Sequence, residues 1–310
     1  KAAATINAGT YASTDGSVLV YDAADRTNIE DAFNKNYTIK YTDSFVVNKA
    51  ELTLNTTGSK TYGDEATAAN LKDITGTGFK NTDADILANN QAVFKGYVDN
   101  KKAAATINAG TYASTDGSVL VYDAADRTNI EDAFNKNYTI KYVDKFDINK
   151  RKITVTQTGT KEYGTGSEHS TYSEVGLDNV ANGQEAAIKA ATNTKDSSTR
   201  TTNVGSYKNT EGKDNGLLTV GISGIDDIMK NYDVTYNTTM NVTPADFTYT
   251  SDHTEYWQGT PIPAQTGKVT NRFGEDVSDL VGKTTWDTPA DTYTPGIYPI
   301  WGHGANDFTG

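Results

Sequence analysis

The residues of this 310-residue chain that could carry chemistry are few, and several of them occur twice. Glu30-Asp31 returns as Glu131-Asp132, and such a pair could supply the two carboxylates of a glycoside hydrolase. An enzyme needs one assembled site, whereas these acids repeat with their surroundings and lie opposite the apolar side of a predicted helix. We therefore expect a solvated helix face there and no catalytic residues.

Two oxygen-rich stretches are candidates for calcium. Aspartates and asparagines gather at Asp22, Asp25, Asn28 and Asp31, and again at Asn81, Asp83 and Asp85. Calcium takes six to eight oxygen ligands, but neither stretch has the spacing of an EF-hand or of a glycine-rich nonapeptide repeat. The three histidines, His169, His253 and His303, are isolated in the sequence, so a shared metal site is not expected. We expect no cofactor, with a calcium ion that stiffens a unit or a junction as the alternative.

All three tryptophans lie beyond residue 243, at Trp257, Trp286 and Trp301. Tryptophan and tyrosine are the side chains that a sugar-binding face would use. These three are therefore the candidate ligand-facing aromatics, and packing in a core is the alternative role for them.

Charge and composition exclude several classes of partner. The formal net charge is -12 and the isoelectric point is about 4.7, which argues against nucleic acid and against an anionic membrane surface. No apolar run approaches the roughly 20 residues of a membrane helix. The chain has no cysteine, which excludes disulfides and thiolate sites.

The elements that must position these residues belong to a repeat. Residues 1–41 return unchanged as residues 102–142, which is typical of a tandem array. Within the repeat, apolar residues alternate with polar ones from Tyr37 to Val47, the period-2 pattern of a half-buried strand. The same pattern occurs over residues 138–148 and, in diverged form, over 232–242. The sequence therefore predicts one long strand used three times.

Shorter signals precede each of these strands. Thr27-Asn28-Ile29-Glu30 has the form of a capping box, which predicts a short helix with Ile29 and Phe33 on its apolar side. A Gly-x-Tyr followed by a polar turn and a strand such as Val18–Val20 predicts a hairpin.

These landmarks predict a mainly β chain of elongated tandem modules, each a small β-sandwich or β-grasp-like unit with one short helix. We expect residues 1–48 to be the carboxy-terminal half of a module and 49–149 a complete one. Residues 150–243 would be a complete diverged module, and 244–310 the first part of a proline- and tryptophan-containing one. Very short linkers favour a stiff array. Because Lys1 falls inside a repeat phase, we expect the chain to be a piece of a longer protein.

Several short motifs occur in a fixed order: Leu52-Thr53-Leu54, then Lys60-Thr61-Tyr62-Gly63-Asp64, then Gly-x-Tyr, then Asn-Tyr-x-Ile-x-Tyr. In this order the chain resembles the MBG and YDG repeats, mostly β modules arrayed in large secreted adhesins and filamentous haemagglutinin-like exoproteins of bacteria. Lys161-Glu162-Tyr163-Gly164 fits the same pattern, and Trp257 stands where these repeats usually have glycine. The resemblance implies stalk repeats on a bacterial surface and carries no catalytic residues over.

Three functions follow as hypotheses. The first is a non-enzymatic stalk or spacer that projects a binding region from the cell, with neighbouring modules as its partners. The second is a filament or sheath in which further copies of the chain join head to tail by strand complementation, because residues 1–48 and 244–310 together make about one unit. The third is a carbohydrate-binding module in the last segment, with host or matrix glycans as partners.

Overall fold

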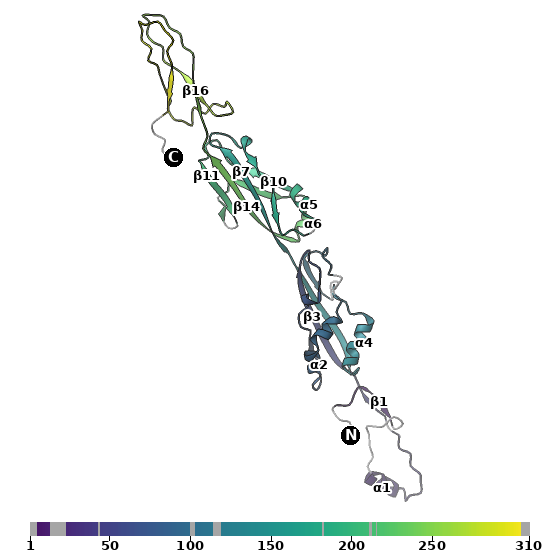
Figure 1. Cartoon of the computed structure of the whole chain (residues 1–310). Coiled ribbons are helices and arrows are strands. Elements are labelled where there is room, and N and C mark those ends of the chain that lie inside the picture. The colour runs from purple at the N-terminus through teal and green to yellow at the C-terminus, as the bar shows by residue number, and fades with distance from the viewer. Residues whose placement is uncertain are drawn as a thin grey trace. The chain divides into compact units, whose positions relative to one another are not determined.

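The computed structural model describes residues 5–12, 23–42, 44–99, 103–113, 119–181, 183–210, 213–214 and 216–304. The chain divides into two compact units, Lys1–Arg151 and Lys152–Gly310, and each is described by itself. Both are built from small sheets with short helices, which confirms the mainly β prediction (Figure 1).

The first unit is organised around a four-stranded sheet in the order β4-β3-β6-β5. Its central strands, β3 (Ala50–Thr61) and β6 (Tyr138–Asn149), are each 12 residues long and run parallel from the pair Ala50 and Tyr138 to the pair Thr61 and Asn149. The edges are β4 (Thr75–Thr77) and β5 (Gly110–Ala113), both antiparallel to their neighbours. Because β3 and β6 run parallel, the chain enters the sheet at Ala50, at one end, and leaves it at Asn149, at the other end.

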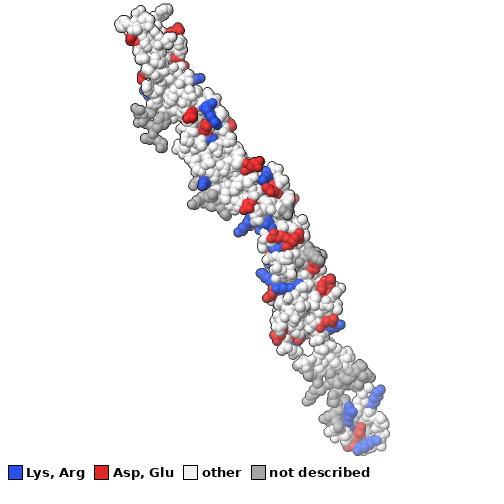
Figure 2. Space-filling view, viewed as in Figure 1, with Lys and Arg blue, Asp and Glu red and all other residues white. Residues whose placement is uncertain are grey.

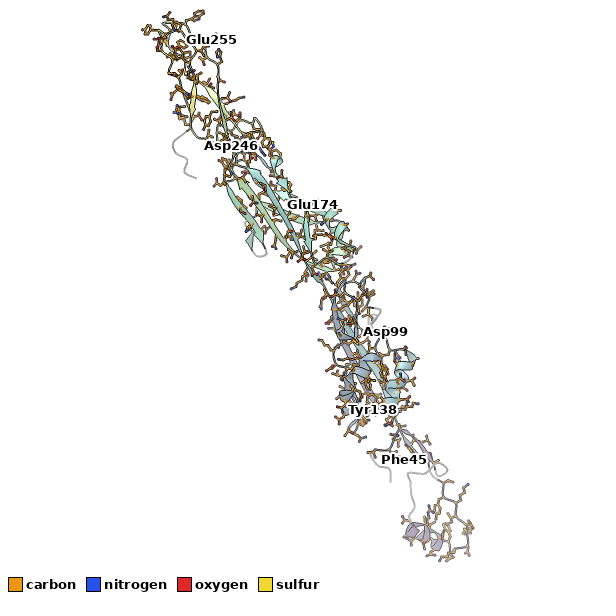
Figure 3. All side chains as sticks on the ribbon, in the orientation of Figure 1. Phe45, Asp99, Tyr138, Glu174, Asp246 and Glu255 are labelled. Atoms are coloured by element: carbon orange, nitrogen blue, oxygen red, sulfur yellow. The ribbon has the colours of Figure 1, made fainter. Side chains whose placement is uncertain are left out.

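Helices bring their apolar side chains to this sheet, and Figure 1 shows α2 and α4 alongside β3. They are α2 (Asp83–Asn89), α3 (Gln91–Gly96) and α4 (Ala124–Ala133), with the 3-10 turn η1 at Ala68–Asn70. The Phe134 ring lies 5.6 Å from that of Phe94 and 5.8 Å from that of Tyr138, centroid to centroid, and all three side chains are buried. Tyr138 stands at the start of β6 (Figure 3), and its hydroxyl donates to Asp83 of α2 at 2.6 Å.

Two local predictions for this part of the chain are wrong. The helix does not begin at a Thr-led capping box: Asp123 is the N-cap of α4 and accepts from the Asp126 amide, while Thr128 lies inside the helix and donates to the Ala124 carbonyl. The single helix expected per module is also too few, because the described residues between 49 and 149 contain three helices.

The predicted hairpin after Gly-x-Tyr is confirmed only in the second unit, where Gly205–Thr210 pairs antiparallel with Lys213–Asp214. In the first unit β5 pairs with the long closing strand β6, and Val121 forms only an isolated bridge with Asp99. The corresponding Val18–Val20 lies outside the described residues.

The first copy of the repeat keeps only part of this architecture. It contains β1 (Gly9–Ala12), α1 (Ala23–Ala32) and β2 (Ser44–Val47), and β1 pairs with β2 in the register that β5 and β6 use. Residues 37–41 form no strand, although the identical residues 138–142 begin β6. The predicted strand over Tyr37–Val47 is therefore confirmed only from Ser44 to Val47.

The second unit contains a six-stranded sheet with the path β12-β11-β14-β7-β8 and with β9 on β7. Its closing strand β14 (Tyr232–Thr243) confirms the third predicted strand and is a hydrogen-bonded neighbour of β7 (Arg151–Glu162). The other members are β8 (Thr171–Tyr172), β9 (Gly176–Asp178), β11 (Gly205–Thr210) and β12 (Lys213–Asp214). A separate pair, β10 (Thr192–Asp196) with β13 (Leu218–Ile222), accompanies α5 (Glu185–Ala190), α6 (Asp226–Met229) and the 3-10 turn η2 (Ser167–His169).

Beyond residue 243 the second unit has two antiparallel pairs. One joins β15 (Thr248–Ser251) to β16 (Gly267–Thr270), and the other joins β17 (Thr285–Asp287) to β18 (Trp301–His303). A small core of Val269, Val277 and Val281, with Phe247 and Leu280 against it, holds this segment.

Candidate functional site

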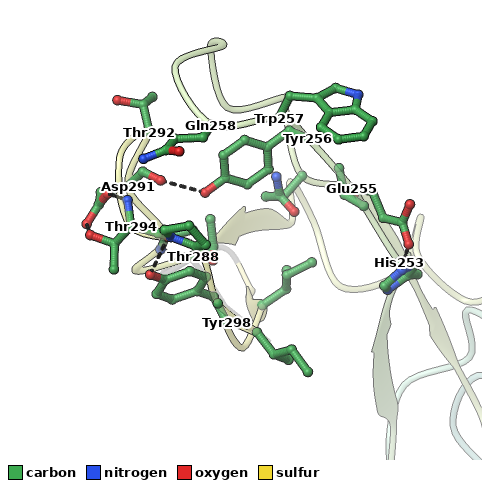
Figure 4. Close-up of a pocket in the computed structure, with 17 residues that line it drawn as sticks. His253, Glu255, Tyr256, Trp257, Gln258, Thr288, Asp291, Thr292, Thr294 and Tyr298 are labelled. Carbon is green, nitrogen blue, oxygen red and sulfur yellow. Dashed lines mark hydrogen bonds and ion pairs between the residues drawn. The ribbon is translucent and has the colours of Figure 1, made fainter.

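A cavity of about 760 Å³ lies in the segment beyond residue 243. Two stretches of chain form most of its wall, residues 253–258 and 288–300 (Figure 4). Trp257 lines it and is 83% exposed, so its indole is available to a ligand. Tyr256 and Tyr298 lie inward of Trp257 in the close-up.

Hydrogen bonds between side chains and backbone hold the two stretches together. The Tyr256 hydroxyl donates to the Asp291 carbonyl at 2.7 Å, and the Gln258 amide donates to the Tyr293 carbonyl at 2.6 Å. The Asp291 carboxylate accepts from the amides of Tyr293 and Thr294, and these bonds hold its pKa below the usual range. Asp291 therefore fixes the turn.

This arrangement suits binding better than catalysis. An exposed indole offers an apolar face, and aromatic rings with a polar rim bind flat, half-apolar ligands such as sugar rings. Glu255, the other acid in the wall, faces His253 at 3.1 Å.

The structure does not gather the three tryptophans into one site. Trp286 is partly buried, with its ring centroid 6.2 Å from that of Tyr249 and close against Gly267 and Gly302. Trp301 lies on β18, is 48% exposed and does not line the cavity. Of the three candidates, Trp257 alone lines the cavity.

The repeated acids lie on helix surfaces. Asp31 pairs with Lys35 at 3.1 Å and Asp132 with Lys136 at 3.0 Å, both one helical turn apart. Glu30 is exposed and Glu131 is partly exposed. The two Asp–Lys contacts are surface ion pairs, which contribute little to stability.

Among the described residues, the two oxygen-rich stretches contribute no group of three close His, Asp or Glu side chains. Asp83 accepts the Tyr138 hydroxyl, and Asn81 has a positive φ of 53° in the turn before α2. Asp25 and Asn28 lie on α1, and Asp22 lies outside the described residues. Over the described part of the chain, one group of three His, Asp or Glu side chains has its ligand atoms within 4.8 Å: Glu168, His169 and Glu275. The other two histidines lie elsewhere, beside Glu255 and Asp287.

That group belongs to a joint within the second unit that the sequence did not indicate. His169 of η2 stacks on Phe273 with centroids 3.9 Å apart, and its Nε2 lies 2.9 Å from Glu275 Oε1. The hydrogen bond from His169, and to a smaller extent the one from Asn271, holds the pKa of Glu275 below its ordinary value. Arg200 adds an ion pair with Asp279. No local sequence pattern indicated this joint, because the residues that form it lie far apart in the sequence.

A second missed feature is a buried lysine in each unit. Lys60 Nζ donates to the carbonyls of Asp64 and Ala104 at 2.7 and 2.8 Å. Lys161 Nζ donates to those of Thr165 and Thr199 at 2.7 and 2.6 Å. Burial lowers the pKa of both amines. The shared Lys-x-Tyr-Gly was the available signal, because a repeated lysine between apolar strand positions indicates a structural role.

Comparisons with protein-family models, with curated proteins and with solved structures found no match to this chain. The described helices include none long and apolar enough to cross a membrane. Acidic and basic side chains are interspersed on the face shown in Figure 2.

Proposed function

We propose that the chain is a load-bearing spacer built from tandem β modules of the sandwich or grasp type, belonging to a bacterial surface adhesin. The observation that carries the proposal is the parallel pairing of β3 with β6, the first and last strands of residues 49–149. Support for the bacterial surface comes from the resemblance of the sequence motifs to MBG and YDG repeats.

Parallel pairing of terminal strands suits a tensile role. Tension applied at Ala50 and Asn149 acts along two strands that are paired over 12 residues, a length of about 40 Å. The ladder is then loaded in shear, so many backbone hydrogen bonds must fail together. Pulling from one end would instead break them one pair at a time.

The connection to the next strand is short. β6 ends at Asn149 and β7 begins at Arg151, with only Lys150 between them. Arg151 donates to the Tyr62 carbonyl at 2.7 Å and pairs with Asp64, so the exit of the chain is anchored to the Tyr62-Gly63-Asp64 turn. Such an anchor passes force into the folded ladder.

Single-molecule stretching tests the proposal, and the absence of native cysteines allows handles to be placed freely. Cysteine handles at Ala50 and Asn149 load the β3–β6 pair in shear, and handles at Thr61 and Asn149 peel it from one end. We expect the shear geometry to need a several-fold higher rupture force at the same pulling speed. Equal forces in the two geometries would rule out a load-bearing ladder.

A second function is favoured by the exposed Trp257 in the cavity wall, and we propose carbohydrate binding at this position. A glycan array probed with the 310-residue chain should give hits that Trp257→Ala abolishes. Trp301→Ala is the matched control, since Trp301 is also exposed but lies outside the cavity. Hits that survive Trp257→Ala, or an array without hits, would remove this function.

A further inference from the structure

The joint within the second unit brings together three side chains of the kinds that bind metal ions. Glu168 and His169 belong to η2, which lies between β7 and β8 in the chain, and Glu275 belongs to the turn after β16. His169 Nε2 lies 2.9 Å from Glu275 Oε1 and 3.9 Å from Glu168 Oε1. All three ligand atoms lie within 4.8 Å of one another. Two carboxylates and one imidazole therefore meet at this point.

The separations of these atoms are close to those around a bound zinc ion. Zn²⁺ lies about 2.0–2.1 Å from a histidine nitrogen and about 2.0–2.2 Å from a carboxylate oxygen. Two ligands at tetrahedral corners around such an ion are about 3.4 Å apart. This value falls between the 2.9 and 3.9 Å measured from His169 Nε2. A change of about 0.5 Å in each separation would accommodate the ion, with water in the fourth position.

A buried asparagine orients the Glu275 carboxylate. Asn271 is 3% exposed, and its Nδ2 donates to Glu275 Oε2 at 2.6 Å and to the Gly164 carbonyl at 3.3 Å. Its Oδ1 accepts from the backbone amides of Phe273 and Glu275, both at 3.0 Å. Hydrogen-bond partners of this kind orient the ligands in metal sites. Oε2 is thus held by Asn271, while Oε1 faces His169.

The imidazole and the second carboxylate are positioned as well. The His169 ring stacks on Phe273 with an angle of 16° between the ring planes, and this contact fixes the direction of Nε2. A Cβ at Gly166 would clash with both carboxylate oxygens of Glu168, so the glycine leaves room for this carboxylate beside η2.

The repeat itself does not require these ligands. Counted from the buried lysines Lys60 and Lys161, the first unit has Thr67 at the position of Glu168 and Ala68 at that of His169. Both units nevertheless form a 3-10 turn here. A role in the fold of the turn therefore does not explain why the second unit has two ligand side chains in it.

The charges at the joint suit a cation. Two carboxylates and a neutral imidazole together carry two negative charges. Arg200 pairs with Asp279, and Arg272 pairs with Glu162 at 3.1 Å, so each of these arginines has an acid of its own. Without an ion, His169 Nε2 and Glu275 Oε1 share a hydrogen bond. A metal ion would take the place of that proton, because metal ligands bind in their deprotonated form.

We propose that Glu168, His169 and Glu275 bind a divalent transition-metal ion, with Zn²⁺ as the best fit, and that the ion clamps η2 to the turn after β16. The nitrogen ligand favours this class over calcium, which takes oxygen ligands. None of the three residues lines the cavity at Trp257. The site is also independent of the load-bearing proposal, since it needs no tension on the chain.

Calorimetric titration with zinc chloride tests the site on the 310-residue chain after treatment with a chelator. Loss of even a hydrogen-bond partner of a metal ligand typically weakens binding about 10–100-fold, so Glu168→Gln should weaken it about tenfold or more. The Glu168 side chain is 65% exposed and takes no part in the bond between His169 and Glu275, so this change leaves the metal-free joint intact. Glu174→Gln, at another exposed glutamate of the same unit, is the matched control and should bind zinc like the unmodified chain.

A second pair of variants tests the imidazole. His169→Ala should weaken zinc binding about tenfold or more. His253→Ala is the matched control: His253 also lies beside a glutamate, Glu255, at 3.1 Å, but among the described residues it belongs to no group of three ligands. A large excess of calcium chloride should leave zinc binding unchanged, because calcium does not favour the nitrogen ligand.

Three outcomes of these titrations would overturn the proposal. The first is a chain that binds no zinc. The second is equal binding within either matched pair of variants. The third is displacement of zinc by calcium, which would mean that zinc binds only the carboxylates of an acidic surface.

Hydrogen exchange tests the clamp separately. Zinc should slow amide exchange at residues 167–170 and 271–278 of the unmodified chain, because the ion opposes the local opening that exchange requires. It should have little effect on the same segments of Glu168→Gln. Exchange that zinc leaves unchanged in the unmodified chain would show that no ion holds the two segments together.

Discussion

At the scale of single residues, the side chains with the strongest structural roles are those that serve backbone groups. Lys60 and Lys161 each bind two carbonyls from different segments, and Asp291 binds two amides of its own turn. Charged groups are used here because a charge-assisted hydrogen bond is stronger than a neutral one. The residues that first suggested catalysis, Glu30 and Asp31 with their copies, lie on helix surfaces.

Replacing Lys60 with methionine should destabilise the first unit. The apolar stem keeps its packing, but the carbonyls of Asp64 and Ala104 lose their donor. A buried polar group left without a partner costs about 1–3 kcal/mol. Urea unfolding of Lys60→Met should show a loss of this size. Lys141→Met, an exposed change in β6, is the control; equal stability of the two variants would mean that the Lys60 amine is dispensable.

The joint at Glu275 should make the second unit sensitive to acid. Hydrogen bonds from His169 and Asn271 depress the pKa of Glu275 in the folded state from its ordinary value of 4.5. A depressed acid stabilises the fold fully above its unfolded pKa, and this contribution is lost as the pH falls through the folded pKa. We expect a decline in the stability of the second unit below about pH 4.5 that is shallower in Glu275→Gln.

Urea midpoints measured down to about pH 3 would check this. Glu174→Gln changes another exposed glutamate of the same unit and should keep the steep decline. If Glu275→Gln and Glu174→Gln decline alike, the joint has no part in the acid response.

At the scale of elements, the alternating pattern predicted the long strands well where a neighbour exists. Tyr138–Asn149 and Tyr232–Thr243 are strands, whereas residues 37–41, which are identical to 138–142, are not. A strand gains its hydrogen bonds from a partner, so a pattern specifies which face is apolar and not whether a ladder forms. The predicted start of the helix was wrong, because Asp123 and not Thr128 is the N-cap of α4.

The candidate site was predictable only in part. Tryptophans confined to one segment indicated where to look, and Trp257 does line the cavity there. The cavity itself depends on how residues 253–258 meet 288–300, a long-range contact that local sequence does not encode. Trp286 and Trp301 could not be separated from Trp257 by residue type alone.

Hydrogen exchange offers a direct comparison of the two copies. Residues 37–41 and 138–142 have the same sequence and thus the same intrinsic exchange rates, except where neighbours differ. Amides within 138–142 are held in the β6 ladder, so we expect strong protection there and little at 37–41. Peptides that extend into the differing residues 42–48 and 143–149 distinguish the copies by mass. Matching protection in dilute solution would contradict the described difference.

At the scale of the whole molecule, the pairing of β3 with β6 governs when the first unit can fold. Ala50 of β3 pairs with Tyr138 of β6, which lies far along the chain. The central ladder of the first unit therefore closes a long loop. Folding of such a sheet is slow, because the entropy of closing the loop is lost before the contacts between the strands form. A chain that emerges residue by residue therefore keeps each unit unfinished until its last strand has appeared, and folding proceeds one unit at a time in the order of synthesis.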